Sequence, residues 1–359
     1  MLNSTKTQTR RPLSPDLDFP PLKTLLVELP LSTVTAAYER ERIAFLITKD
    51  HPERLPLTLP VLARSVDRLY VLDSSRGSAT KEFCSSLGKA VEFHGPVEQE
   101  RMISAQPILD QALRSGLITR FSDDSWDIWS KRNYALLISK LEGLSNILII
   151  DDDIIPAAGL IEDVLSLSTE YGLVGSNVTG MPDVSVVGHV CKLVGVTNQD
   201  FVSGHFLAIN VPLTSQYYFP NMYNEDWVFV MLNSLSARIA RFSTVFQLYW
   251  NPYHDTAQRL AFEEPGEIFV EGMARALLSQ ASLAPLSSHE HWQEVIDERG
   301  KQLNQLASSE LAQAAPAIAQ LLTVASAKAQ SIAPLDMLSM WQGYVDGLTK
   351  WRAIINGAD

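Results

Sequence analysis

The feature of this sequence that most constrains its fold is a set of apolar runs of strand length, each followed by a segment of helical character. Residues 42–48 (RIAFLIT) form an unbroken apolar run, which is typical of a strand buried on both faces of a parallel sheet. Similar patterns predict strands at 68–72, 90–93, 146–150, 173–176 and 206–210, and helices at 52–65, 80–87, from 130 onward and over 225–235. Strands that alternate with helices at short spacing indicate βαβ units. The sequence therefore predicts an α/β fold with a mainly parallel sheet.

A change of composition near residue 280 predicts a second region. From 281 to 359, Ala, Gln, Leu and Ser dominate and strand patterns stop, so we expect a helical region after an α/β domain at 21–280. Residues 1–20 are polar, and we expect a flexible tail there. Trp341, Tyr344 and Leu348 share one helical stripe. This stripe favours helices that pack on the α/β domain or that form a homodimer.

The charge and the cysteines narrow the class of protein. The net charge of −12 disfavours a nucleic-acid or anionic-membrane partner. Two cysteines, Cys84 and Cys191, make no disulfide framework, which favours a reducing, cytoplasmic setting. No apolar run approaches the roughly 18 residues that span a bilayer. The N-terminal residues have no apolar stretch typical of a secretory signal.

Three consecutive aspartates, Asp151, Asp152 and Asp153, follow the apolar run at 146–150. In open α/β sheets, ligands bind at the carboxyl ends of the strands. Because side chains alternate along extended backbone, Asp151 and Asp153 are expected to share one ligand and Asp152 to face elsewhere. Carboxylates of this kind suit Mg²⁺ or Mn²⁺, which usually bind one or two carboxylates together with substrate phosphates. Alone, the pattern fits a solvated acidic turn as well as a cation site.

Five segments, in this order, resemble the GT-A glycosyltransferases, especially their family 2-like group. They are 45–55 (FLITKDHPERL), 70–75 (YVLDSS), 130–153 (SKRNYALLISKLEGLSNILIIDDD), 203–210 (SGHFLAIN) and 224–229 (NEDWVF). The resemblance covers roughly residues 45–260 and leaves out the C-terminal helices. It implies a GT-A, Rossmann-like mixed sheet. It also implies metal-dependent transfer of a sugar from a nucleotide-diphosphate donor, UDP-linked first and GDP-linked second, to a hydroxyl acceptor.

The resemblance also implies roles for residues that would bind the donor. Thr48 and Asp73 would line the nucleoside pocket, and Arg132 would contact the base or the diphosphate. Asp151 would approach the ribose or the sugar and, with Asp153, hold the metal. Gly204 would let the backbone approach the sugar. Taken without the resemblance, Arg132 is also compatible with a surface helix charge, and Asp73 with a turn residue.

Glu225 and Asp226 are the candidate catalytic residues. In an inverting transfer a carboxylate must take the proton from the attacking hydroxyl. The resemblance gives this role to Asp226, with Glu225 as its partner. In a retaining transfer the two would position the acceptor instead. Both also suit the first turn of a helix, where acids complement the helix dipole.

Histidines and tryptophans supply further candidates. Some GT-A enzymes use a late histidine as a third metal ligand, and His254 lies in a suitable place; imidazole suits Mn²⁺ better than Mg²⁺. A loop histidine bonded to backbone is the alternative. His189 and His205 flank the strand predicted at 206–210, where either an acceptor contact or a structural role is possible. Trp227 and Trp250 suit either sugar stacking or the core.

Three rival functions remain open. A sugar-phosphate nucleotidyltransferase shares the substrates, but it normally needs a Gly-rich loop near the first strand, and TKDHPER lacks the glycines. A phosphohydrolase with Asp151 as nucleophile would place its aspartate strand first in the domain. The third is a catalytically inactive, GT-A-shaped module that binds partners.

Overall fold

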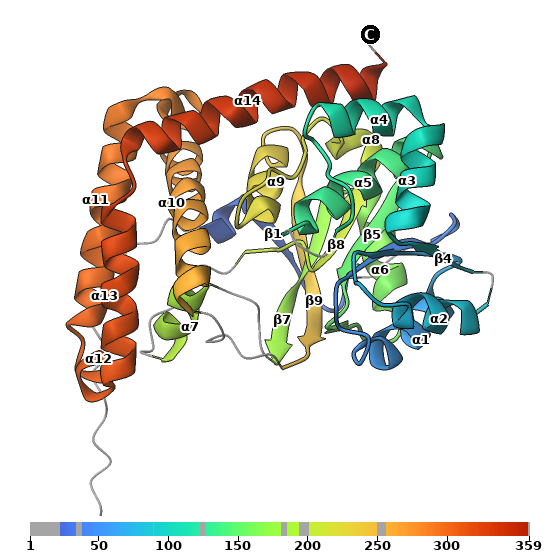
Figure 1. Cartoon of the computed structure of the whole chain (residues 1–359), viewed down its shortest axis with the longest axis horizontal. Helices are drawn as coiled ribbons and strands as arrows, with labels where there is room; N and C mark the ends of the chain where they lie inside the picture. The colour runs from blue at the N-terminus through green and yellow to red at the C-terminus, as the bar shows by residue number, and fades with distance from the viewer. Residues whose placement is uncertain are drawn as a thin grey trace, which may run out of the picture.

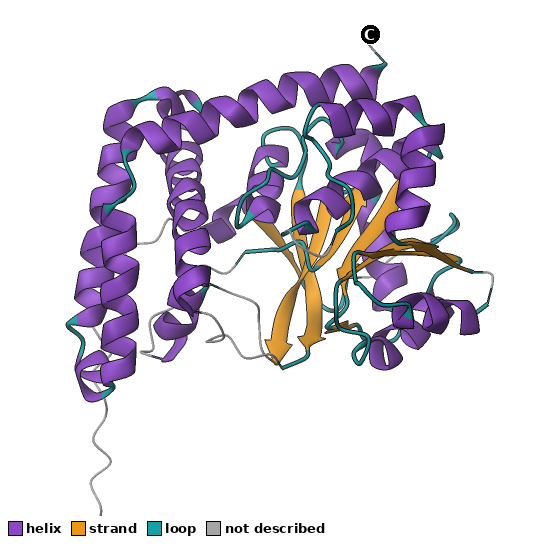
Figure 2. Ribbon diagram, in the orientation of Figure 1, coloured by secondary structure: helices purple, strands orange, loops and turns teal. Residues whose placement is uncertain are grey.

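The computed structural model describes residues 22–33, 38–88, 90–122, 126–180, 185–193, 201–249 and 256–357. The predicted tail at 1–20, His254 and Trp250 lie outside the described residues. One sheet runs through the α/β part, and helices cover both of its faces (Figure 2). Among the described helices, none has the length and apolar character required to cross a membrane.

The strands of the sheet follow the order β1-β9-β7-β8-β5-β2-β3-β4, and β6 pairs with β9. Their bounds are β1 (Leu26–Leu29), β2 (Ile43–Thr48), β3 (Arg68–Asp73), β4 (Val91–His94), β5 (Asn146–Asp151), β6 (Ile154–Ile155), β7 (Leu173–Gly180), β8 (Phe206–Asn210) and β9 (Ile239–Gln247). β8 is antiparallel to β5 and β7, and β6 is antiparallel to β9, whereas the other pairs are parallel. The predicted α/β class, with a mixed and mainly parallel sheet, is therefore confirmed.

The described helices include those that the sequence predicts at 52–65, 80–87, from 130 onward, over 225–235 and after 281, together with others that were not predicted. They are α1 (Leu55–Ser65), α2 (Ala79–Ser86), α3 (Pro96–Ala105), α4 (Pro107–Arg114), α5 (Ile128–Leu141), α6 (Leu160–Ser168), α7 (Val186–Leu193), α8 (Val211–Thr214), α9 (Glu225–Asn233), α10 (Thr256–Gln280), α11 (His289–Ala307), α12 (Glu310–Ala314), α13 (Pro316–Gln330) and α14 (Pro334–Asn356). All six predicted strands are present. β1, β6 and β9 were not predicted.

Alternate residues of β2 divide the core between the two faces of the sheet. Leu46 packs with apolar side chains of α1, α2 and α6. Phe45 and Ile47 point to the opposite face and join the core formed with α3, α4, α5, α8 and α9. Because β2 is buried along its whole length, its apolar run meets helices on both sides, as a parallel strand requires.

The C-terminal helices belong to the same core as α5 and α9. Helix α10 contacts α9 on one side and α11 and α13 on the other, and α14 crosses the molecule to reach α4 (Figure 1). Trp351 on α14 donates to the carbonyl oxygen of Ser215 at 2.8 Å, and Tyr344 stacks on Tyr218 with ring centroids 4.8 Å apart. The apolar stripe of α14 thus packs on the α/β part. The boundary at 280 stays a prediction, because α10 contacts both regions.

Candidate active site

Three of the residues expected to bind a donor lie at one edge of the sheet. Thr48, Asp73 and Asp151 are the last residues of the neighbouring parallel strands β2, β3 and β5. Thr48 is opposite Asp73 in the strand register, and Ile47 is opposite Asp151. The sheet therefore presents these side chains together at its carboxyl edge, where open α/β sheets bind ligands.

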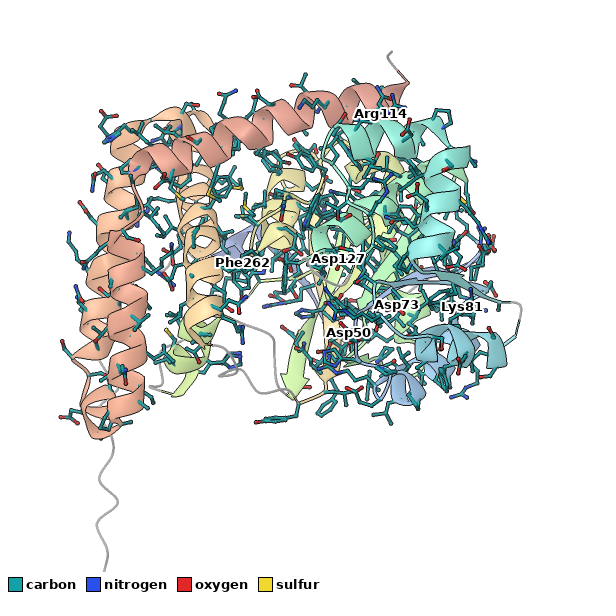
Figure 3. The ribbon with its side chains drawn as sticks, in the orientation of Figure 1. Asp50, Asp73, Lys81, Arg114, Asp127 and Phe262 are labelled. Atoms are coloured by element: carbon teal, nitrogen blue, oxygen red, sulfur yellow. The ribbon has the colours of Figure 1, made fainter. Side chains whose placement is uncertain are left out.

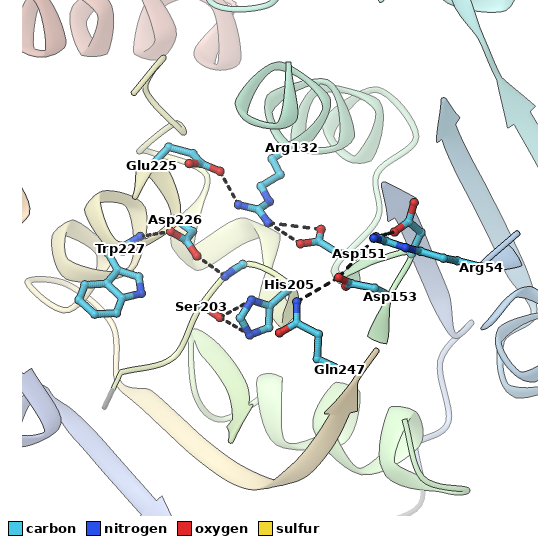
Figure 4. A network of polar contacts seen from close by, with 12 residues as sticks. Arg54, Arg132, Asp151, Asp153, Ser203, His205, Glu225, Asp226, Trp227 and Gln247 are labelled. Atoms are coloured by element: carbon cyan, nitrogen blue, oxygen red, sulfur yellow. Dashed lines mark hydrogen bonds and ion pairs between the residues drawn. The ribbon is translucent and has the colours of Figure 1, made fainter. Parts of the chain in front are cut away.

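Arg132 connects this edge to the start of α9 (Figure 4). Its Nη1 donates to Glu225 Oε1 at 2.5 Å, and its Nη2 lies 3.2 Å from Asp151 Oδ2. Only 3% of the side chain is exposed. Burial disfavours the charged guanidinium, but Asp151 and Glu225 raise the pKa of Arg132 above its ordinary value. Arg132 is therefore a fixed, buried cation rather than a surface helix charge.

Glu225 and Asp226 open α9, directly after Asn224, which has a left-handed backbone (φ 61°). Asp226 Oδ2 accepts from the backbone N–H of Gly204 at 2.6 Å, and its Oδ1 accepts from that of Trp227 at 2.8 Å. These two bonds fix the orientation of the Asp226 carboxylate. Burial raises the pKa of Glu225 to about 8, against the opposing effect of Arg132.

Gly204 makes room for the guanidinium of Arg132. A Cβ at this position would lie 2.5 Å from Arg132 Cζ. A side chain here would displace Arg132 and also strain the bond from the Gly204 N–H to Asp226. The glycine therefore serves the ion-pair network, and its predicted role towards a sugar stays a prediction.

The aspartates do not alternate as the sequence predicts, because β5 ends at Asp151 and residues 152–153 form a turn. Asp151 faces Arg132, whereas Asp153 faces Arg54 and Gln247 (Figure 4). The two carboxylates thus have different partners in this structure.

Asp152 is anchored more firmly than the sequence suggests. Its Oδ2 accepts from the hydroxyl of Thr48 at 2.6 Å, and its Oδ1 accepts from Arg54 Nη1 at 3.1 Å. Arg54 precedes α1, so this ion pair connects that helix to the turn after β5. Arg54 lies in the HPER sequence at residues 51–54, and apart from the resemblance nothing in the sequence predicted a role for it.

Asp153 has one carboxylate oxygen available for a further ligand. Gln247 Nε2 donates to Oδ2 at 3.1 Å, and Arg54 lies 3.6 Å from the same oxygen. Oδ1 is buried and has no hydrogen-bond partner among the described residues. Burial, and then the neighbouring Asp152, raise the pKa of Asp153. A cation at Oδ1 would give this oxygen a partner and would offset the repulsion between the carboxylates of Asp152 and Asp153.

No group of three or more His, Cys, Asp or Glu side chains that could hold a metal occurs among the described residues. His254, the predicted third ligand, is not one of them. A metal held by Asp153 together with substrate phosphates stays a prediction. Mg²⁺ and Mn²⁺ sites of this kind are common for nucleotide substrates.

Lys131 is a buried cation that the sequence analysis missed, although it precedes Arg132 directly. Its Nζ donates to the carbonyl oxygen of Thr48 at 2.9 Å and to Ser74 Oγ at 2.7 Å, and it lies 3.1 Å from Asp127. Burial lowers the pKa of Lys131, while Asp127 opposes this effect. Figure 3 shows Asp127 and Asp73 on the same side of the molecule, near the strand ends. Lys131 thus ties α5 to the carboxyl ends of β2 and β3.

The two described histidines with predicted roles are both buried. The hydroxyl of Ser203 lies 2.6 Å from His205 Nε2, and burial lowers the pKa of His205 to about 4. Burial also lowers the pKa of His189, on α7, to about 4. Both rings are therefore neutral near pH 7. His205 contributes to the cavity that adjoins Asp226, and His189 does not.

A cavity of about 100 Å³ adjoins this network. One side of it is formed by the ends of β5, α5 and α9, and the other by α7, α10 and α11. Its polar lining comprises Arg132, Asp151, Ser185, Ser203, His205, Asn224, Glu225, Asp226, Glu267, Glu271 and Arg299. The residues from α10 and α11 had no signal in the sequence, because isolated helical charges usually indicate a solvated face.

Comparisons with known proteins give matches of fold only. No family model matches the chain, and no curated protein matches it. Among solved structures it is similar to residues 1–349 of S. aureus TarS in complex with UDP, at 15% identity over 85% of this chain and 92% of that chain, with a TM-score of 0.40. The same TarS fragment in another structure gives 13% identity over 86% and 92%, with a TM-score of 0.41. A longer TarS structure gives 14% identity over 89% and 55%, with a TM-score of 0.40.

Proposed function

We propose that this protein is a glycosyltransferase that moves a sugar from a nucleotide-diphosphate donor to a hydroxyl acceptor. The observation that supports it best is the buried network centred on Arg132. This network joins Asp151, at the carboxyl end of β5, to Glu225 and Asp226, at the start of α9, beside a cavity that these side chains line. Sugar transfer needs such an arrangement, with donor groups on one side and a carboxylate for the acceptor on the other.

Asp226 is the candidate base for an inverting transfer. Its carboxylate lies at the cavity and is oriented by the backbone N–H groups of Gly204 and Trp227. Each oxygen keeps a second lone pair that can accept a hydrogen bond from an acceptor hydroxyl. Glu225, which is paired with Arg132, would hold the helix start and the guanidinium in place rather than take the proton.

The donor would lie along the carboxyl ends of β2, β3 and β5. Asp73 and Thr48 would contact the nucleoside, for which uridine is the first candidate and guanosine the second. Arg54 brings a positive charge to the turn at Asp152 and Asp153, next to the proposed diphosphate position. Arg132, with both terminal nitrogens engaged by carboxylates, would act on the donor mainly by orienting Asp151.

Asp153 would hold a divalent cation, Mn²⁺ or Mg²⁺, through the buried Oδ1 that has no protein partner among the described residues. When bound, such an ion neutralises charge on a leaving diphosphate. Gln247 fixes the other oxygen of Asp153, which leaves Oδ1 directed away from the amide. The ion would also compensate the buried charge of Asp153 beside Asp152.

Isothermal titration with UDP and GDP, with and without Mn²⁺, tests this proposal. We expect one of the two to bind, and to bind at least about tenfold more weakly without the metal, a loss of about 1.4 kcal/mol. Asp153→Asn should abolish the metal effect, whereas Asp297→Asn, on the exposed face of α11, should not. If neither nucleotide binds, or if Asp153→Asn leaves the metal effect intact, the assignment of the donor site is wrong.

A further inference from the structure

The cavity has a second wall that lies outside the α/β sheet. Glu267 and Glu271 come from α10, and Arg299 comes from α11. Figure 1 shows α10 between the sheet and α11, so the helical region closes the side of the cavity that faces α9. Asn224, which precedes α9, donates to Glu267 Oε1 at 3.3 Å and joins this wall to the catalytic carboxylates.

The second wall carries more negative than positive charge. Arg299 donates to both oxygens of Glu264 at 3.0 Å, and its Nη1 donates to Glu271 at 2.7 Å. Glu267 lies 3.9 Å from the same Nη1. One buried guanidinium thus faces three acidic side chains, of which Glu271, with its pKa raised by burial to about 7, is partly protonated near pH 7. A further positive charge in the cavity would compensate this excess, because uncompensated buried charge is unfavourable.

The cavity as a whole has the same imbalance. Five acidic side chains line it, and two guanidinium groups oppose them, although Glu225 and Glu271, with pKa values of about 8 and about 7, are partly protonated near pH 7. The terminal nitrogens of both arginines are already bonded to carboxylates. A phosphate or carboxylate on a ligand would therefore meet mostly like charge and occupied donors, which disfavours anionic ligands here.

Aromatic side chains complete the lining. Trp126, Tyr223 and Trp227 lie at the cavity, and 47% of Trp126 is exposed. Trp126 packs on Phe262 of α10 with ring centroids 5.3 Å apart, which holds its ring at the cavity. Aromatic faces next to carboxylates attract an ammonium group and also stack on the apolar faces of sugar rings.

We propose that this side of the cavity is the acceptor subsite, and that it selects a hydroxylated acceptor that carries a protonated amine and no phosphate or carboxylate. This proposal rests on the proposed function, because the bound compound is an acceptor only if the protein transfers a sugar to it. Glu267 and Glu271 contact the amine, and Arg299 is a positioning residue that holds Glu271 in place. The C-terminal helices, which the donor side does not use, thereby set the acceptor class.

Binding of three matched probes tests this proposal on the full chain. Glucosamine, glucose and glucose 6-phosphate have similar rings and differ in charge, and their binding can be followed by the fluorescence of Trp126 and Trp227 or by ligand-observed NMR. The wild-type protein should bind glucosamine about threefold or more tighter than glucose, as expected for one added cation–carboxylate or cation–π contact. Glucose 6-phosphate should bind more weakly than glucose.

Two variants test whether Glu267 and Glu271 cause the preference for glucosamine over glucose. Glu271→Gln and Glu267→Gln keep the shape of the side chain and should each reduce the glucosamine preference towards that of glucose. Glu298→Gln is the matched control, because Glu298 is a half-buried residue of α11 that is paired with Arg275 outside the cavity. Equal binding of glucosamine and glucose 6-phosphate, an unchanged preference in both Gln variants, or no binding of glucosamine by the wild type would each overturn the proposal.

Titration of the same samples with UDP and GDP separates the proposed function from the proposed acceptor subsite. If UDP and GDP fail to bind while the amine preference holds, the proposed function fails and the charge selectivity of the cavity stands. If UDP binds to wild type and variants alike but the amine preference is absent, the acceptor proposal fails alone.

Discussion

The guanidinium of Arg132 lies 2.5 Å from Glu225 and 3.2 Å from Asp151, so one buried cation joins the end of β5 to the first turn of α9. These two elements carry the residues proposed for the donor and for the acceptor. Arg132, which is itself on a third element, α5, therefore helps to fix their relative position.

Replacing Arg132 should be costly for stability as well as for activity. Arg132→Ala leaves the buried carboxylates of Glu225 and Asp151 without a counter-charge. We expect a loss of about 3–5 kcal/mol in the free energy of unfolding, the usual cost of removing one partner of a buried ion pair. Urea denaturation followed by circular dichroism measures it. A loss well below about 1 kcal/mol would show that Arg132 does not compensate buried charge at this site.

Gly204→Ala should reduce activity through the same network. The added methyl group would lie 2.5 Å from Arg132 Cζ, and it would push the guanidinium away from Asp151 and Glu225. Gly343→Ala is the matched control, because its Cβ would meet nothing within 4 Å. In the helix α14 it should increase stability by about 0.5–1 kcal/mol. Sugar transfer that is equal in both variants would mean that Arg132 can move without consequence.

Asp152→Asn and Asp153→Asn should have different effects on stability and on metal-dependent binding. Asp152 accepts from Thr48 and from Arg54, so its loss should cost about 1.5–3 kcal/mol of stability, the range for hydrogen bonds to a charged group. Burial and Asp152 already disfavour the charge of Asp153, so its neutral variant should remain as stable as the wild type. Metal-dependent nucleotide binding should be lost only in Asp153→Asn. If metal-dependent nucleotide binding is instead lost only in Asp152→Asn, the metal ligand is Asp152 and not Asp153.

Stability should fall as the pH rises from about 4.5 to 7, in part because of Glu271. Burial raises the pKa of Glu271 from 4.5 to about 7, against the effect of Arg299. The folded protein therefore holds this proton more firmly than the unfolded chain, and the resulting stabilisation is present below pH 4.5 and lost as the pH passes 7. Glu271→Gln removes this titration, so its unfolding free energy should depend less on pH over that interval. Parallel pH profiles for the two proteins would contradict the pKa shift.

The parts of the fold that were predicted are those with a local signal. Uninterrupted apolar runs identified β2 and β5, because a strand buried on both faces has no polar alternation. β1 and β9 lacked this signal: β9 has the mixed sequence IARFSTVFQ, and the four residues of β1 pair with it at the edge of the sheet. Their pairing joins residues far apart in the chain, which no short pattern records.

The candidate site could be predicted from the sequence only where residue types and their spacing indicate a chemical role. The three aspartates, Arg132 and Glu225-Asp226 stood out by their order and spacing. Their actual partners did not, because the turn after β5 redirects Asp153 towards Arg54 and Gln247. The wall formed by Glu271 and Arg299 depends on two helices packing together, and either charge alone resembles a solvated helix face.

The most direct test of the central claim is a panel of UDP- and GDP-linked sugars, incubated with the protein and Mn²⁺ and scored for release of the nucleoside diphosphate. The account predicts that at least one of these donors is cleaved between the sugar and the diphosphate, and that Asp153→Asn abolishes the reaction. Release of pyrophosphate from nucleoside triphosphates and sugar phosphates would instead indicate a nucleotidyltransferase. If none of the donors is cleaved, with or without added hydroxyl acceptors, the protein is not the glycosyltransferase proposed here.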